Sequence, residues 1–430
     1  MVLGVIRDLL WSFPVVSLLI ISGGYFVYKT KFRILCPVCL IKDTLGKSIK
    51  SSENKMKLLA SVSTALGGTV GVGSIMGVSL ALNVGGAGSI FWMWVSGLCG
   101  MGLKYAEVFI AVKHRKRLGD GSFAGGAPYA LTEIGHSGLG KMFAFLTVFA
   151  SFGVGNMTQI SALTDCVSEI GISPLVCGAI CAGFLAFAVF GGQNRIGKIN
   201  LFSVPAASFI YIFIMGYILC LRFQSIPGVF LRILKEAFGL RSAVGGISGV
   251  IFAAGIREGF ARGIFSSEAG VGSSPLAHAS SGEGDPCKQG EWGAFEVLVD
   301  TFFVSTLTAF ALLSTGNHKV SGLFVSLLGT AGLWLFIGLT VVFAFSSILS
   351  WCFYADVCLT FLHIPYGKAV YRGLCVAVVL LGSFLPASIF WVTADILNAL
   401  MMFPNLFLLF LTRKEITFRT TKEKQYVAQR

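Results

Sequence analysis

Two glycine-rich clusters lie inside long apolar stretches, at residues 67–77 and 262–275, where they read GGTVGVGSIMG and RGIFSSEAGVGSSP. Each glycine weakens a helix interior by about 1 kcal/mol relative to alanine, so clusters of this kind predict interrupted helices. Unwound backbone at membrane depth survives only where it is buried in protein or lines a polar cavity. There its carbonyls can bind a cation, and a half-helix N-terminus can bind an anion such as a carboxylate. Close helix packing through small residues is the alternative.

Other chemistry-bearing patterns are sparse. Cys36 and Cys39 have the spacing of a metal or redox pair, but no second pair or His cluster accompanies them. The Gly-x-Gly run lacks the strand and downstream acid of a dinucleotide site, and the chain has no Walker A, HExxH or GxSxG motif. These absences argue against a nucleotide-driven pump and against a membrane-embedded enzyme, so we expect no organic cofactor.

The elements that hold the two clusters are predicted to be membrane helices. Apolar residues make up 55% of the 430, and charged residues make up 12%, about half the share in soluble domains. A soluble enzyme, a disordered chain and a disulfide scaffold are therefore excluded. Transmembrane barrel strands would alternate in polarity, which these runs do not. Eleven segments can each cross the hydrocarbon layer as a helix: roughly 10–28, 57–83, 87–112, 139–166, 173–191, 200–221, 243–277, 291–314, 324–361, 369–385 and 387–411.

The basic residues predict the orientation of these helices. With the N-terminus outside, 24 of the 33 Lys and Arg residues lie in cytoplasmic segments, six lie outside and three lie within spans. We therefore expect a multi-pass protein of a bacterial-type inner (plasma) membrane, with the N-terminus outside and the C-terminus cytoplasmic. The net charge of +13 then reflects orientation and contact with anionic membrane lipids, and no nucleic-acid partner is expected.

The two glycine clusters fall in the second and seventh predicted helices, which enter the membrane from opposite sides because they are five helices apart. Helices 2–6 and 7–11 thus form two units of inverted topology, a pattern typical of secondary transporters with a midplane binding site. The predicted organisation is as follows: an extra N-terminal transmembrane helix (1–28), a basic cytoplasmic loop (29–56), a first inverted repeat (57–222), an extracellular amphipathic connection (223–242), a second inverted repeat (243–411) and a basic cytoplasmic tail (412–430).

Five ordered blocks resemble motifs of the alanine or glycine:cation symporter family, the sodium:alanine symporters: 67–77, 85–94 with 104–107, 155–159, 262–275 and 343–351. The resemblance covers nearly the whole chain. It implies an all-α, LeuT-type 5+5 inverted-repeat fold with one extra N-terminal helix. The implied activity is symport of a small neutral amino acid, alanine or glycine, with Na+ as the coupling ion, by alternating access.

The resemblance also implies a site. The substrate carboxylate would lie at the unwound backbone of Val72, Gly73 and Ser74. The amine and side chain would lie near Gln159, Phe265, Ser266 and Trp351. By analogy with the wider superfamily, sodium would bind to Gly67, Val70, Phe343, Ser346 and Ser347. The family usually has Thr, Asn and Asn where this chain has Val72, Ser74 and Ser267, which leaves substrate choice and the coupling ion open.

Acidic residues inside the spans need a partner or water, because a lone charge at membrane depth is costly. Glu268 follows the second cluster, and we expect it to anchor the unwound loop, with a gate or proton site as the alternative. Asp300 and Asp356 are expected to be structural, and Lys104 is expected to pair with Glu107. In a proton-coupled carrier of the same fold, Glu268 or Asp300 would be essential. A channel is a further alternative.

Overall fold

The computed structural model describes residues 2–45, 52–238, 247–385 and 387–418. Parts of five predicted segments lie outside the described residues: residue 1 of the N-terminal helix, 46–51 of the basic loop, 239–242 of the amphipathic connection, 243–246 and 386 of the second repeat, and 419–430 of the basic tail.

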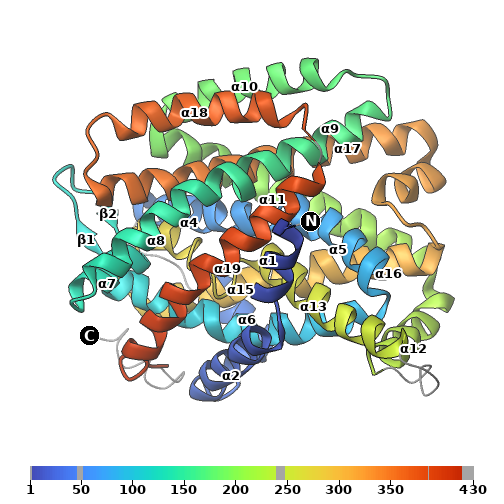
Figure 1. The fold of residues 1–430 in the computed structure, drawn as a ribbon, viewed down its shortest axis with the longest axis horizontal. Helices are drawn as coiled ribbons and strands as arrows, with labels where there is room; N and C mark the ends of the chain where they lie inside the picture. The colour runs from blue at the N-terminus through green and yellow to red at the C-terminus, as the bar shows by residue number, and fades with distance from the viewer. Residues whose placement is uncertain (1, 46–51, 239–246, 386, 419–430) are drawn as a thin grey trace.

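The described chain is a bundle of helices with one β-hairpin, in which each strand has two residues (Figure 1). Its first part contains α1 (Val2–Leu10), α2 (Phe13–Lys29), α3 (Pro37–Leu45), α4 (Ser52–Thr69), α5 (Val72–Gly85), α6 (Gly88–Lys113), β1 (Lys116–Arg117), β2 (Phe123–Ala124), α7 (Ala127–Glu133), α8 (Ser137–Ala150), α9 (Thr158–Ser168), α10 (Pro174–Phe190) and α11 (Gly192–Leu221). Its second part contains α12 (Ile226–Ala237), α13 (Ile247–Ser267), α14 (Pro275–His278), α15 (Pro286–Val297), α16 (Thr306–Thr315), α17 (Val320–Leu362), α18 (Gly367–Gly382) and α19 (Ala387–Thr412). Two π-helical segments, Ser151–Met157 and Leu298–Ser305, connect α8 to α9 and α15 to α16.

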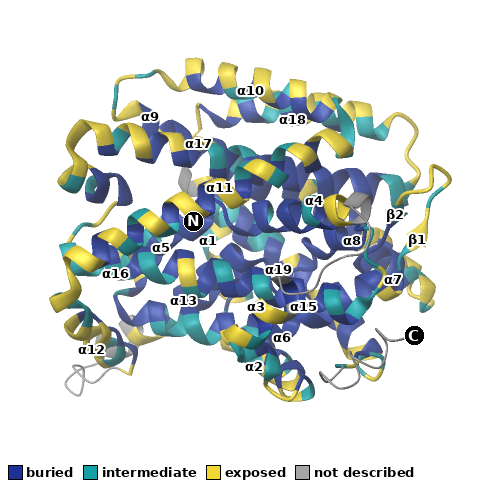
Figure 2. Ribbon diagram, turned by 180° about the vertical axis from the view of Figure 1, so that it is seen from behind, coloured by how far each residue is buried: buried dark blue, intermediate teal, exposed yellow. Residues whose placement is uncertain are grey.

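Eight helices of the described ranges are long and apolar enough to cross a membrane: Leu3–Lys29, Lys55–Gly85, Gly88–Lys113, Ser137–Ser168, Gly192–Leu221, Pro286–Thr315, Val320–Leu362 and Ile389–Thr412. The other three predicted segments fall on α10, α13 and α18, which have 17, 21 and 16 residues. Exposed residues lie on the outside of the bundle and buried residues fill its centre (Figure 2). The count of eleven crossings stays a prediction.

Helix α6 defines two opposite ends of the bundle. At its start, the Ala87 backbone N–H donates to Glu236 of α12 at 2.7 Å, and we call this end the α12 face. In its last turn, Lys113 pairs with Glu415 at 2.8 Å, and we call this end the C-terminal face. The N-terminal helix α1 joins the α12 face through Glu258, whose Cβ atom packs against the end of α5 at Gly85. Arg7 of α1 therefore lies toward the α12 face, whereas Glu415 lies at the C-terminal face.

Both predicted helix interruptions are confirmed. The first is short, since only Val70 and Gly71 separate α4 from α5. The second extends over residues 268–274, between α13 and α14, and it includes positive φ angles at Glu268, Gly270 and Gly272. The two broken helices run in opposite directions. The α4–α5 pair ends at the α12 face, whereas α13 begins near that face and α14 leads to residues that contact Arg115 at the C-terminal face.

Candidate functional site

A cluster of side-chain oxygens joins the two interruptions. Ser74 lies in the first turn of α5, Ser266 near the end of α13 and Asp300 in the second π-helical segment. The Ser266 Oγ atom lies 2.7 and 2.8 Å from the two Asp300 carboxylate oxygens and 2.9 Å from Ser74 Oγ, and Ser74 Oγ contacts the same carboxylate. All three residues are buried. Four oxygens that share two hydroxyl hydrogens can hold a proton or a hard cation.

The first interruption exposes backbone to a side chain from a third element. The Val72 backbone N–H donates to Gln159 Oε1 at 3.3 Å, and Gln159 Nε2 donates to the Val154 carbonyl at 3.3 Å. Gln159 lies on α9, directly after the first π-helical segment. Because α5 begins at Val72, the N–H group of this residue has no carbonyl partner within the helix and is available to a side chain. The amide of Gln159 can therefore exchange its contact with Val72 for a contact with a ligand.

Position 71 requires glycine because the Ser347 side chain approaches its backbone closely. A Cβ atom at this position would lie 2.2 Å from Ser347 Oγ, so that no larger residue fits the observed packing. Ser347 donates in turn to the Gly67 carbonyl at 2.8 Å. Among the five residues predicted to bind sodium, these two come from different helices and are in contact.

The other three predicted sodium ligands are arranged differently. Ser346 Oγ donates to the Phe343 carbonyl at 3.0 Å, so these two groups are hydrogen-bonded to one another within α17. Val70 lies in the interruption, and its backbone N–H donates to the Leu66 carbonyl at 2.6 Å. The set offers carbonyl and hydroxyl oxygens, the ligand type that a hard cation prefers.

Phe265 and Trp351, the two aromatic residues predicted near the substrate, have different packing partners. Phe265 packs on Gly73, where a Cβ atom would come within 2.9 Å of the ring, and contacts Trp391 of α19 in a tilted arrangement, with ring centroids 4.8 Å apart and an interplanar angle of 45°. Trp351 instead packs against Gly155 of the first π-helical segment, where a Cβ atom would lie 2.2 Å from Trp351 Cβ. Trp391 lies in no motif of the sequence and was not predicted.

Glu268 occupies the second interruption with φ 51°. Its carboxylate accepts a hydrogen bond from Ser273 Oγ at 2.7 Å and lies 3.1 Å from the position of a Cβ atom on Gly68. The carboxylate thus binds its own loop and packs on the end of α4. This geometry is that of the predicted anchor for the unwound segment.

Lys104 and Glu107 are each bound to another element rather than to one another. The Lys104 ammonium donates to Ser274 Oγ at 2.7 Å, and Glu107 Oε1 accepts from Asn405 at 2.5 Å. The expected pair is therefore replaced by contacts that fasten the second interruption, because Asn405 also donates to the Gly270 carbonyl at 2.9 Å.

The remaining predicted features are structural. Asp356 pairs with Arg372 at 2.5 Å, in agreement with the structural role expected for it. The Cys39 backbone N–H donates to Cys36 Sγ at 3.3 Å. Within the ranges that the structure describes, no group of three or more His, Cys, Asp or Glu residues is arranged to hold a metal ion.

Sequence reasoning missed two acids of the site's surroundings, Glu258 of α13 and Asp395 of α19. Both are buried to 1% exposure and both bind arginine side chains. A signal was present, because an ionisable residue inside a predicted span is a functional candidate by default. What the sequence does not indicate is that these two acids lie together, 137 positions apart in the chain.

Comparison with known proteins gives consistent results. A family model described as the sodium:alanine symporter family matches residues 1–430. The sodium/alanine symporter AgcS of Methanococcus maripaludis is 34% identical over 93% of this chain and 92% of its own length. The probable sodium/glutamine symporter GlnT of Bacillus subtilis is 30% identical over 100% of this chain and 91% of its own length. A crystal structure of a manganese transporter from Eremococcus coleocola is similar in fold, with a TM-score of 0.50 at 13% identity, over 84% of this chain and 78% of that one.

Proposed function

The chain belongs to the sodium:alanine symporter family, and we propose that it imports a small neutral amino acid, alanine or glycine, together with sodium. Family membership makes it a multi-pass membrane transporter that couples amino-acid movement to a cation, and not an enzyme. The identity of the amino acid and the choice of sodium are the parts that we propose.

The observation that carries the proposal is the meeting of two interrupted helices of opposite direction at one buried polar cluster. Secondary transporters use such interruptions because unwound backbone supplies both donors and acceptors at membrane depth. Here the cluster contains Ser74 from one broken helix and Ser266 from the other, both in contact with Asp300. The opposite directions of α4–α5 and α13–α14 support an inverted repeat of LeuT type over 57–222 and 243–411.

In the proposed site, the substrate carboxylate binds the N-terminal end of α5 at Val72, Gly73 and Ser74. A helix N-terminus favours an anion through its free N–H groups and its dipole. The amine is placed at the C-terminal end of α13, near Ser266, and Gln159 provides an adaptable amide.

Phe265 is the proposed wall against the substrate side chain, and its contact with Gly73 supports a small one. Trp351 lies one turn beyond Ser347 on α17 and is proposed to line the site from that side.

The proposed sodium site lies between α4 and α17, with Gly67, Val70, Phe343, Ser346 and Ser347 as ligands. The contact between Gly67 and Ser347 supports it. One sodium ion moving down ~100 mV supplies about 2.3 kcal/mol, and a tenfold sodium gradient adds about 1.4 kcal/mol. Together they support an accumulation of the amino acid of roughly several hundred-fold.

The proposed topology has eleven crossings, with an extra helix before a ten-helix core. The contact of Arg7 toward the α12 face and that of Glu415 at the C-terminal face support an odd number of crossings. The distribution of Lys and Arg supports an N-terminus outside a bacterial-type plasma membrane, with the basic loop and tail in the cytoplasm against anionic lipids. The α12 face is then extracellular.

Uptake of labelled alanine into proteoliposomes tests the function. With sodium inside and outside set independently at fixed pH, we expect saturable uptake that requires an inward sodium gradient. Glycine should compete better than glutamine. Full uptake after choline replaces sodium would refute sodium coupling, and flux that rises linearly with substrate without saturation would indicate a channel.

A proton-coupled carrier is the second candidate, favoured by the burial of Asp300 between two serine hydroxyls. In that case an inward proton gradient alone should drive uptake, and Asp300→Asn should abolish this proton-driven uptake while leaving exchange of internal for external alanine.

A further inference from the structure

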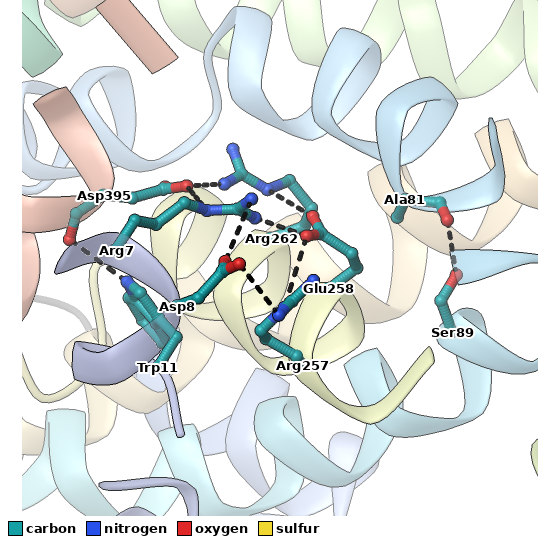
Figure 3. A network of polar contacts seen from close by, with 9 residues as sticks. All are labelled: Arg7, Asp8, Trp11, Ala81, Ser89, Arg257, Glu258, Arg262 and Asp395. Atoms are coloured by element: carbon teal, nitrogen blue, oxygen red, sulfur yellow. Dashed lines mark hydrogen bonds and ion pairs between the residues drawn. The ribbon is translucent and has the colours of Figure 1, made fainter. Parts of the chain in front are cut away.

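A second polar network lies outside the site, at the α12 face, and joins α1, α13 and α19 (Figure 3). Arg7 of α1 donates through Nε to Asp395 Oδ2 at 2.9 Å, and its Nη2 atom contacts Glu258. Arg262 contacts the same two carboxylates, Asp395 directly and Glu258 at 3.7 Å. Both acids are therefore shared by Arg7 of α1 and Arg262 of α13.

The network is buried and nearly balanced in charge. The side chains of Glu258, Arg262 and Asp395 are each exposed by 1%, and that of Arg7 by 16%. With Arg262 alone, the two acids leave one uncompensated negative charge in a buried place, which is costly. Arg7 supplies the missing positive charge.

Beneath this network lies the aromatic layer of the candidate site. The Arg262 guanidinium carbon lies 5.4 Å from the Phe265 ring centroid and 5.3 Å from that of Trp391. Phe265 in turn covers Gly73. From the outside inward, the order is thus α1, the ion-pair network, the aromatic pair and the interruption of the first broken helix. Access to the site from the α12 face is closed by these layers.

Arg7 bridges the two helices that would have to separate for this side to open. Its guanidinium binds Asp395 on α19 with one nitrogen and Glu258 on α13 with another. A planar fork with several donors suits such a bridge, and a lysine ammonium does not reproduce its geometry. The Trp11 indole also donates to the Asp395 carbonyl at 3.1 Å, which fixes the end of α1 at the same place.

We propose that α1 is a moving part of the gate at the α12 face, with Arg7 as the positioning residue that holds α13 and α19 together in the closed state. The inference rests on the proposed function, since a gate requires a carried substrate. On opening, Arg7 leaves at least one of its two acids and α1 moves away from the seam. Loss of Arg7 should therefore favour the open state on this face and slow its closure.

Arg257 provides a matched control. It lies on the same face, next to Glu258 in the chain, and pairs with Asp8 at 3.3 Å. Its side chain approaches Glu258 only to 3.9 Å, is 31% exposed and makes no contact with Asp395. Arg257→Gln thus removes the same charge without removing a bridge between α13 and α19.

The experiment measures access to the layer beneath the network in the full-length protein. A Cβ atom on Gly77 would lie 3.7 Å from Arg262 Cδ, an ordinary contact, so Gly77→Cys adds a side chain beside Arg262 whose Cβ atom fits the packing. A membrane-impermeant thiol reagent is applied to right-side-out and to inside-out vesicles. Labelling of the protein that keeps Gly77 is subtracted, because it measures the reaction of the other cysteines. In the Arg7→Gln background we expect at least tenfold faster labelling of Cys at position 77 from the α12 face only. The Arg257→Gln background should stay within twofold of the parent.

Uptake kinetics and a conservative variant complete the test. Arg7→Gln should lower the maximal rate of alanine uptake several-fold with little change or a fall in KM, and Arg7→Lys should restore part of the rate. Unchanged labelling in Arg7→Gln, or equal acceleration in Arg257→Gln, would overturn the role of Arg7. Failure of the unaltered protein to take up any amino acid with a cation would instead overturn the proposed function, while the labelling result would still report on the contact between α1 and α19.

Discussion

The contact between Gly71 and Ser347 allows the candidate sodium site to be tested by two substitutions that correct one another. Gly71 has φ −129° and ψ −161°, an extended conformation that alanine adopts without strain. The obstacle to Gly71→Ala is therefore steric only. Its Cβ atom would lie 2.2 Å from Ser347 Oγ but 3.4 Å from Ser347 Cβ, so the clash involves the hydroxyl alone.

The magnitudes follow from this geometry. Ser347 can avoid the clash only by turning its hydroxyl away from the Gly67 carbonyl, which it binds at 2.8 Å. Overpacking of a core costs about 1–3 kcal/mol, and loss of one hydrogen bond costs about 1 kcal/mol. In Gly71→Ala with Ser347→Ala the hydroxyl is absent, so the overpacking cost disappears. The double variant should be about as stable as Ser347→Ala alone, with an interaction free energy of roughly 1–3 kcal/mol.

Sodium dependence should behave differently from stability, because Ser347 is a proposed sodium ligand. In Gly71→Ala the Ser347 hydroxyl is turned away, and in Ser347→Ala and the double variant it is absent. We therefore expect each of the three variants to raise the half-saturating sodium concentration for alanine uptake by about tenfold, which corresponds to about 1.4 kcal/mol. The stability lost in Gly71→Ala should thus be recovered by the second substitution, while the sodium affinity is not.

Thermal unfolding of the purified protein and sodium titration of uptake in proteoliposomes provide the two measurements. Ser326→Ala, at a position of α17 that precedes its kink at Gly329, serves as the control, since the Ser326 hydroxyl donates to the Leu323 carbonyl at 2.8 Å. If the double variant unfolds at the temperature expected from simple addition, the packing argument is wrong. If Ser347→Ala leaves the sodium titration unchanged, the assignment of Ser347 to sodium is wrong.

Three further outcomes are expected. Asp300→Asn should reduce alanine uptake at least tenfold without unfolding the protein, because an amide keeps the volume but not the two acceptors of the cluster; uptake and thermal unfolding measure the two effects. Gly155→Ala should reduce the folded yield and the unfolding temperature, because its Cβ atom would lie 2.2 Å from Trp351 Cβ. Although partial burial alone would raise the pKa of Glu415, the hydrogen bond from Lys113 helps to hold it below the ordinary value of 4.5. The contact of the C-terminal segment is thus complete above pH 4.5 and is lost as the pH falls through the lower folded pKa, which hydrogen exchange of residues 413–418 should detect.

How much of the fold was predictable depends on the range of the interactions. The apolar segments are local signals, and all eleven fall on helices. Both interruptions are also local, because their glycines lower helix stability wherever the chain places them. The length of an interruption, however, depends on interactions between residues far apart in the chain. The second interruption is stabilised by Asn405, whose side chain donates to the Gly270 carbonyl from 135 residues away.

The candidate site divides in the same way. Ser74 and Ser266 lie in the two motifs and were predicted, but their shared partner Asp300 was expected to be structural. The sequence contains no sign that the helix bearing Asp300 adopts a π-helical turn at Leu298–Ser305, a local widening that often occurs at functional sites. Trp391 was not predicted for a related reason, since a single tryptophan in an apolar helix forms no motif with other residues.

Arg7 shows the limit of charge counting most clearly. In the count of basic residues it is one of six outside charges, a weak topological signal at the start of an apolar segment. The two acids that Arg7 contacts lie 251 and 388 positions away in the chain. The contacts arise because α2 packs closely along α6. A Cβ atom on Gly23 of α2 would lie 2.6 Å from Cys99 of α6, and one on Gly102 of α6 would lie 2.6 Å from the Gly23 carbonyl. That packing brings α1 to the seam between α13 and α19. A helix outside the predicted repeats thereby supplies the charge that two buried acids of the second repeat require, so truncation of the first ten residues should alter closure of the site and not merely membrane insertion.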